Sequence, residues 1–72
     1  MYKDNNEVMP QYTHRVYGKK KTAKQFKPMN LRDGKFVGNL IYASMVDEHA
    51  AKVQVQFLNE NNPDYIFEMR KI

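Results

Sequence analysis

Apolar positions are densest in residues 39–58, and the period of the pattern changes within this stretch. In its first half nearly every position is apolar, which is typical of a strand that is buried on both faces. After Asp47 the apolar side chains recur at helical spacing and fall within one arc of a helix. The pattern therefore predicts a central strand over residues 36–46 that leads into an amphipathic helix.

The predicted helix has a start signal and a stop signal. Asp47 is a suitable N-cap, Glu48 adds favourable charge to the first turn, and Pro63 ends the polar run that follows the helix. Residues 53–57 also alternate with a period of two, which is a strand pattern. The helix also accounts for the apolar residues on either side of this run, so we favour it, and the strand alternative stays open.

Two further strands flank this unit. Residues 11–17 are rich in aromatic and β-branched side chains, and residues 64–72 alternate between apolar and polar positions. The helix is long enough to return the chain beside the central strand, which predicts a right-handed crossover with the last two strands parallel. We therefore expect an α+β fold, a small three-stranded β-sheet with one helix on one face, in the order β-(basic loop)-β-α-β. Residues 1–10 are expected to form a flexible N-terminal arm, and residues 11–72 a single domain.

Length and composition limit the possibilities further. The chain has 72 residues and no cysteine, so neither disulfides nor thiolate-bound metals stabilise it. A domain this small needs tight packing or a partner subunit, which makes a homodimer possible. No apolar run approaches the ~18 residues that span a membrane, and the N-terminal residues lack the apolar core of a signal peptide. We therefore expect a cytoplasmic protein with no membrane partner.

Charge is distributed unevenly. Residues 19–35 carry seven basic residues and one acid, a net charge of +6, whereas the rest of the chain carries −2. Tyr17 and Phe26 lie beside these bases and are candidate aromatic contacts. Such a segment either binds a phosphate backbone, binds an acidic protein, or only keeps a small protein soluble. The candidate contacts with phosphates or an acidic partner are Lys19, Lys20, Lys21, Lys24, Lys27 and Arg32.

Groups that support catalysis are scarce. His14 and His49 are the only histidines, and no cluster with the spacing of a zinc site accompanies them. Asp47 and Glu48 are explained by their place at a helix start. Ser44, the single serine, lacks the G-x-S-x-G context, and the three glycines form no phosphate-binding loop. We expect no catalytic residue, metal, cofactor or small-molecule substrate, and therefore no enzyme.

Three motifs resemble a group of small uncharacterised α+β proteins of low-GC bacteria, their phages and mobile elements. They are Phe26-Lys27-Pro28-Met29-Asn30, Gly38-Asn39-Leu40-Ile41-Tyr42-Ala43 and Phe67-Glu68-Met69-Arg70-Lys71-Ile72. The resemblance covers about residues 12–72. It implies a compact α+β domain of bacterial or phage origin, and it implies no activity.

The sequence thus predicts a small non-enzymatic binding or regulatory protein. We expect it to act through protein–protein contacts, with a protein partner or a second copy, because one helix leaves one face of a three-stranded sheet uncovered. The alternative is an accessory protein that binds nucleic acid through the basic residues 19–35.

Overall fold

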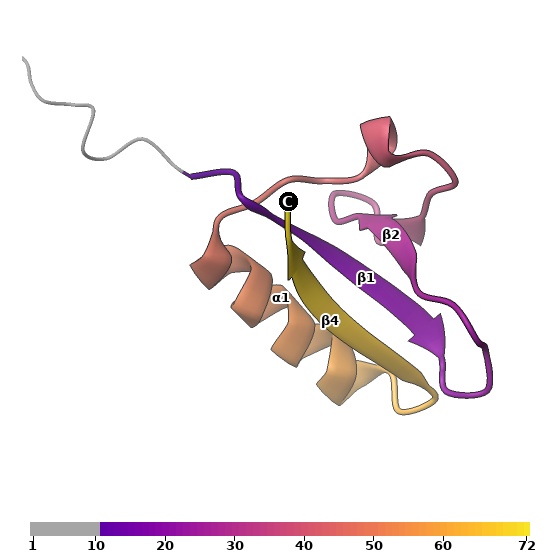
Figure 1. The fold of residues 1–72 in the computed structure, drawn as a ribbon. Coiled ribbons are helices and arrows are strands. Elements are labelled where there is room, and N and C mark those ends of the chain that lie inside the picture. The colour runs from indigo at the N-terminus through magenta and orange to yellow at the C-terminus, as the bar shows by residue number, and fades with distance from the viewer. Residues whose placement is uncertain (1–10) are drawn as a thin grey trace, which may run out of the picture.

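The computed structural model describes residues 11–72, and the prediction of a flexible arm over residues 1–10 lies outside them. Figure 1 shows two long strands side by side, a helix packed across them and a short hairpin beside them. The elements in chain order are β1 (His14–Lys20), β2 (Lys27–Asn30), β3 (Lys35–Phe36), the 3-10 helix η2 (Leu40–Tyr42), α1 (Glu48–Asn61) and β4 (Tyr65–Lys71). Within the described residues no helix is long and apolar enough to cross a membrane.

The strands form a four-stranded sheet in the order β3-β2-β1-β4, and every pair of neighbours is antiparallel. An α+β fold with one helix is therefore confirmed. The sheet has four strands where three were predicted, because the basic segment itself contributes β2 and β3. The predicted parallel crossover is wrong, since β4 pairs with β1 along its whole length, from His14 opposite Lys71 to Lys20 opposite Tyr65.

The predicted central strand over residues 36–46 is also wrong. The strand ends at Phe36, and the chain next forms a β-bridge at Val46, an isolated bridge to His14. Between them the Asn39 side chain accepts a hydrogen bond from the Ile41 backbone N–H at 3.0 Å and caps η2. This local bond competes with strand pairing, which is why an apolar run leaves the sheet here.

The helix is confirmed, with Asp47 as its N-cap. The Asp47 Oδ1 accepts a hydrogen bond from the Ala50 N–H at 2.7 Å. Helical hydrogen bonding continues through Asn61, so residues 53–57 are helix and not strand. The sheet covers only part of the predicted apolar arc: Ala51 is buried, whereas Val53 and Phe57 are exposed.

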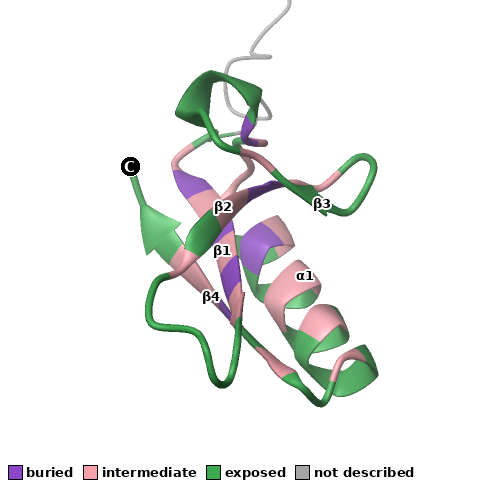
Figure 2. Cartoon of the chain, turned by 90° about the vertical axis from the view of Figure 1, so that its right-hand side faces the viewer, coloured by how far each residue is buried: buried purple, intermediate pink, exposed green. Residues whose placement is uncertain are grey.

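The core lies between α1 and the face of the sheet that the helix covers (Figure 2). It consists of Val16 from β1, Met29 from β2, Ala51 from α1 and Phe67 from β4. Because side chains alternate along a strand, neighbours of these residues point to the opposite, open face of the sheet. The basic and aromatic residues of β1 are divided between the two faces in this way.

Candidate binding surfaces

The six basic candidates do not form one surface. Lys19 and Lys20 are consecutive in β1 and so point to opposite faces of the sheet. Lys27 pairs with Gly18 and shares the helix-covered face with Lys20. Lys21 and Lys24 are exposed in the β1–β2 connection, and Arg32 is exposed in the β2–β3 turn.

The open face of the sheet carries the two predicted aromatic contacts, Tyr17 and Phe26. The Arg70 guanidinium lies 4.4 Å from the Tyr17 ring centroid and 5.2 Å from that of Phe26. Lys19 lies 5.4 Å from the Phe26 centroid and donates a hydrogen bond to the Ala23 carbonyl at 2.9 Å. Arg70 also pairs with Glu68. The two rings therefore meet as predicted, but cations of the chain itself already cover them.

Arg15 adds to the positive charge of this open face. It lies directly opposite Arg70 in the β1–β4 register, and its buried Nε has no hydrogen-bond partner in the described part of the chain. Neither arginine was singled out in the sequence, although strand alternation places Arg15 on the same face as Tyr17.

On the helix-covered face of the sheet, three aromatic rings lie close together beside the β2–β3 hairpin. The ring centroids of Phe36, Tyr65 and Phe67 are 5.9 to 6.5 Å apart, and their planes agree within 19°. Three near-parallel rings that are all about equally close to one another cannot stack face to face in a single line. They are therefore offset from one another and together form one aromatic surface. Phe67 is buried, whereas Phe36 is 38% exposed. Phe36 and Tyr65 therefore present the accessible part of this surface.

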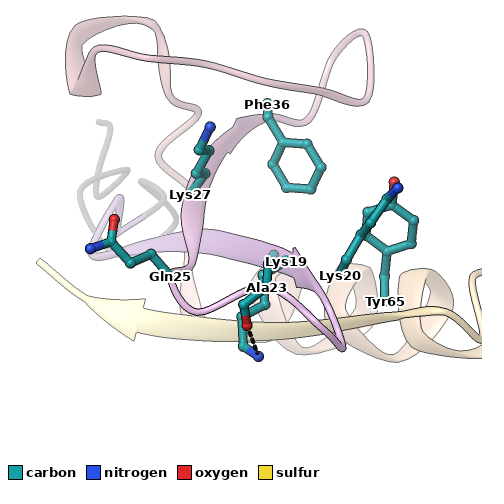
Figure 3. Close-up of a pocket in the computed structure, with 8 residues that line it drawn as sticks. Lys19, Lys20, Ala23, Gln25, Lys27, Phe36 and Tyr65 are labelled. Carbon is teal, nitrogen blue, oxygen red and sulfur yellow. Dashed lines mark hydrogen bonds between the residues drawn. The ribbon is translucent and has the colours of Figure 1, made fainter.

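A cavity of about 190 Å³ lies against these exposed rings. We call this cavity the aromatic pocket. It is lined by Gly18, Lys19, Lys20, Ala23, Gln25, Lys27, Phe36 and Tyr65. Figure 3 shows the rings of Phe36 and Tyr65 on one side of it, while the Lys19 side chain turns away toward Ala23. Neither Phe36 nor Tyr65 was predicted as a site residue, because only the strand register brings them together.

Residues 37–46 form a third surface, which we call the apolar protrusion. It contains no charged residue, although the chain as a whole is 28% charged. Its η2 turn projects from the body of the molecule (Figure 2). The segment is tied down behind this turn, since Ser44 N–H donates to the Met29 carbonyl at 3.0 Å and Ser44 Oγ accepts from Leu31 N–H at 2.8 Å.

The two histidines lie on different elements of the fold. His14 is buried in β1, and its Nδ1 lies 2.8 Å from the Thr13 hydroxyl. His49 is exposed in the first turn of α1. Within residues 11–72 no three His, Cys, Asp or Glu side chains lie close enough together to hold a metal ion.

Comparison with protein-family models, with curated proteins and with solved structures found no match to this chain. The resemblance to small proteins of low-GC bacteria and phages therefore stays a prediction.

Proposed function

We propose that this chain is a non-enzymatic binding protein that acts through protein–protein contacts, and that the apolar protrusion makes those contacts. The observation that carries the proposal is the exposure of four large apolar side chains in a short stretch. Leu40 is 46% exposed, Ile41 76%, Tyr42 63% and Met45 51%. Single exposed apolar residues are ordinary, but a contiguous group of them marks an interaction site.

The composition of the protrusion supports the same proposal. Interface centres are depleted of charged residues and enriched in aromatic residues and methionine. The protrusion holds Tyr42 and Met45 and has no charge between Lys35 and Asp47. Tyrosine is also among the residues that most often dominate binding energy, because it buries a large area with few rotatable bonds.

The anchoring of the protrusion further favours binding. The η2 turn is capped at its start by Asn39 and closed at its end by a 3.0 Å hydrogen bond from Ala43 N–H to the Leu40 carbonyl. Val46 then exchanges two 2.9 Å backbone hydrogen bonds with His14. A surface that is already ordered loses less conformational entropy on binding than a flexible loop.

Photo-crosslinking from position 41 tests this proposal. With a photo-reactive amino acid in place of Ile41, we expect one discrete product, either with a partner protein or with a second copy of the chain. The matched control places the same group at Lys52, which is exposed on α1. Unlabelled wild-type chain should compete the product away, and unlabelled Ile41→Asp chain should not. The same products from positions 41 and 52 would contradict the proposal.

A further inference from the structure

We propose that the aromatic pocket binds one unpaired base of a single-stranded nucleic acid, with Lys20 and Lys27 beside the neighbouring phosphates. This inference goes beyond the proposed protein contacts and uses a different part of the molecule. It also assigns the base contact to Phe36 and Tyr65 in place of Tyr17 and Phe26.

The first argument is which aromatic rings are not covered by a cation of the chain. A base stacks on the face of an aromatic ring, so a ring already covered by a cation is a poor platform. Arg70 lies over both Tyr17 and Phe26. No cation–π contact occupies Phe36 or Tyr65 in the described residues, and a cavity lies against both rings.

The second argument is size. Pockets for whole drug-sized molecules measure about 300 to 1,000 Å³. The aromatic pocket itself measures about 190 Å³, which is room for a single planar ring, so a longer ligand extends into the hollows beside it. Gly18 lets the Phe36 and Phe67 rings lie close over β1 beside this space, because a Cβ at Gly18 would lie 2.5 Å from Phe67 Cδ2 and 3.1 Å from Phe36 Cε1.

The third argument is that further hollows adjoin the pocket on more than one side. One neighbouring hollow, which reaches Gly38, shares Lys27 and Phe36 with it. Another, which reaches Thr22, shares Lys20 and Tyr65. A path that passes through the pocket and extends beyond it at both ends fits an extended chain better than a compact ligand.

The fourth argument is charge. Four lysines, Lys19, Lys20, Lys21 and Lys27, line these three hollows, against one carboxylate, that of Asp64. Lys19 donates to the Ala23 carbonyl, which leaves Lys20, Lys21 and Lys27. Within residues 11–72 no ion pair or hydrogen bond holds these three ammonium groups. Unpaired lysines spaced along a groove are the means by which proteins follow a phosphate backbone without reading its sequence.

Fluorescence anisotropy with a labelled short oligothymidine tests the inference, using the full chain at low and near-physiological salt. We expect binding whose affinity falls with salt, and a loss of at least about fivefold in Phe36→Ala, the low end for one stacked base. Phe57→Ala is the matched control, because Phe57 is 58% exposed on α1 outside the pocket. It should leave affinity unchanged.

A charge-matched pair tests the role of the lysines. Replacing both Lys20 and Lys27 by Gln should lower the slope of log affinity against log salt by about 1.4, since each single-strand phosphate contact contributes about 0.7. Replacing Lys52 and Lys71 by Gln removes the same charge elsewhere and should leave the slope nearly unchanged. Equal effects of the two pairs would overturn the inference, because binding would then follow net charge alone.

Binding and competition experiments with other nucleic acids and nucleotides identify the ligand. Equal affinity for a duplex would overturn the inference, because a paired base cannot enter the pocket. If thymidine monophosphate bound with the same affinity as the oligonucleotide, the ligand would be a free nucleotide and the inference would be overturned. Should Phe36→Ala unfold, NMR of the wild-type chain decides: the amide signals of Gly18, Phe36 and Tyr65 must shift most as oligothymidine is added. Absence of binding at low salt would also overturn it.

Discussion

Gly18 permits the aromatic rings to lie directly over β1. A Cβ at this position would lie 2.5 Å from Cδ2 and 2.6 Å from Cε2 of Phe67, and 3.1 Å from Cε1 of Phe36. Phe67 is also the cross-strand partner of Gly18. Glycine within a strand usually weakens it, but it is required where another group approaches the backbone this closely. The sequence predicts a first strand over residues 11–17, whereas β1 continues past Gly18 to Lys20.

Replacing Gly18 by alanine should therefore destabilise the protein by about 1–3 kcal/mol, the usual cost of overpacking a core. The buried Phe67 ring cannot move aside without disturbing Val16 and Ala51. Urea denaturation followed by circular dichroism measures the change. Gly38→Ala is the control, since a Cβ at Gly38 meets nothing within 4 Å, and it should change stability by less than about 0.5 kcal/mol. Equal stability of both variants would show that the rings do not lie over β1.

At the scale of elements, one side chain joins α1 to the outer edge of β4. The Asn59 Nδ2 donates to the Phe67 carbonyl at 3.1 Å, and its Oδ1 accepts from the Phe67 N–H at 2.8 Å. The Asn59 amide thus pairs with the strand as another backbone would. Unpaired edges are open to association with other strands, and this contact closes part of the β4 edge.

We expect Asn59→Ala to lower the free energy of unfolding by about 1–2 kcal/mol, because two backbone groups of Phe67 lose their partner. The Phe67 amide should also exchange its hydrogen faster. Asn61→Ala serves as the control, since the Asn61 amide only reaches back to the Phe57 carbonyl on the exposed side of the helix. Unchanged exchange at Phe67 in the Asn59 variant would contradict this role.

Sequence reasoning succeeded where the determinants are local. The Asp47 cap and the helical period predict α1, and period-two alternation predicts β4. It failed for residues 36–46, because an apolar run fits a buried strand and an exposed protrusion equally well. The choice depends on long-range pairing, here of β4 with β1, which leaves the run outside the sheet.

The same limit applies to the candidate surfaces. Alternation along β1 places Lys19 and Lys20 on opposite faces of the sheet. The division of the basic residues between two faces could therefore be predicted from the sequence, provided that the first strand was extended to Lys20. The meeting of Phe36 with Tyr65 was not, because it requires the register of β3, β2, β1 and β4 together.

At the scale of the whole molecule, the described residues form a thin core with much apolar surface outside it. Five apolar residues are buried, whereas ten large apolar residues are exposed. Small domains bury a limited fraction of their surface, and those without disulfides or metals gain stability from a partner. The apolar protrusion is the most compact group of these exposed side chains, and covering it would add to stability as well as specificity.

The central claim is that Ile41 lies on an exposed surface in the isolated chain, and cysteine labelling tests it most directly. The chain has no cysteine, so Ile41→Cys carries a single thiol. In dilute protein we predict that a thiol reagent labels this variant about as fast as Lys52→Cys on the exposed side of α1, and far faster than Val16→Cys in the core. Labelling of Ile41→Cys as slow as that of Val16→Cys would place the segment inside the fold and contradict the account.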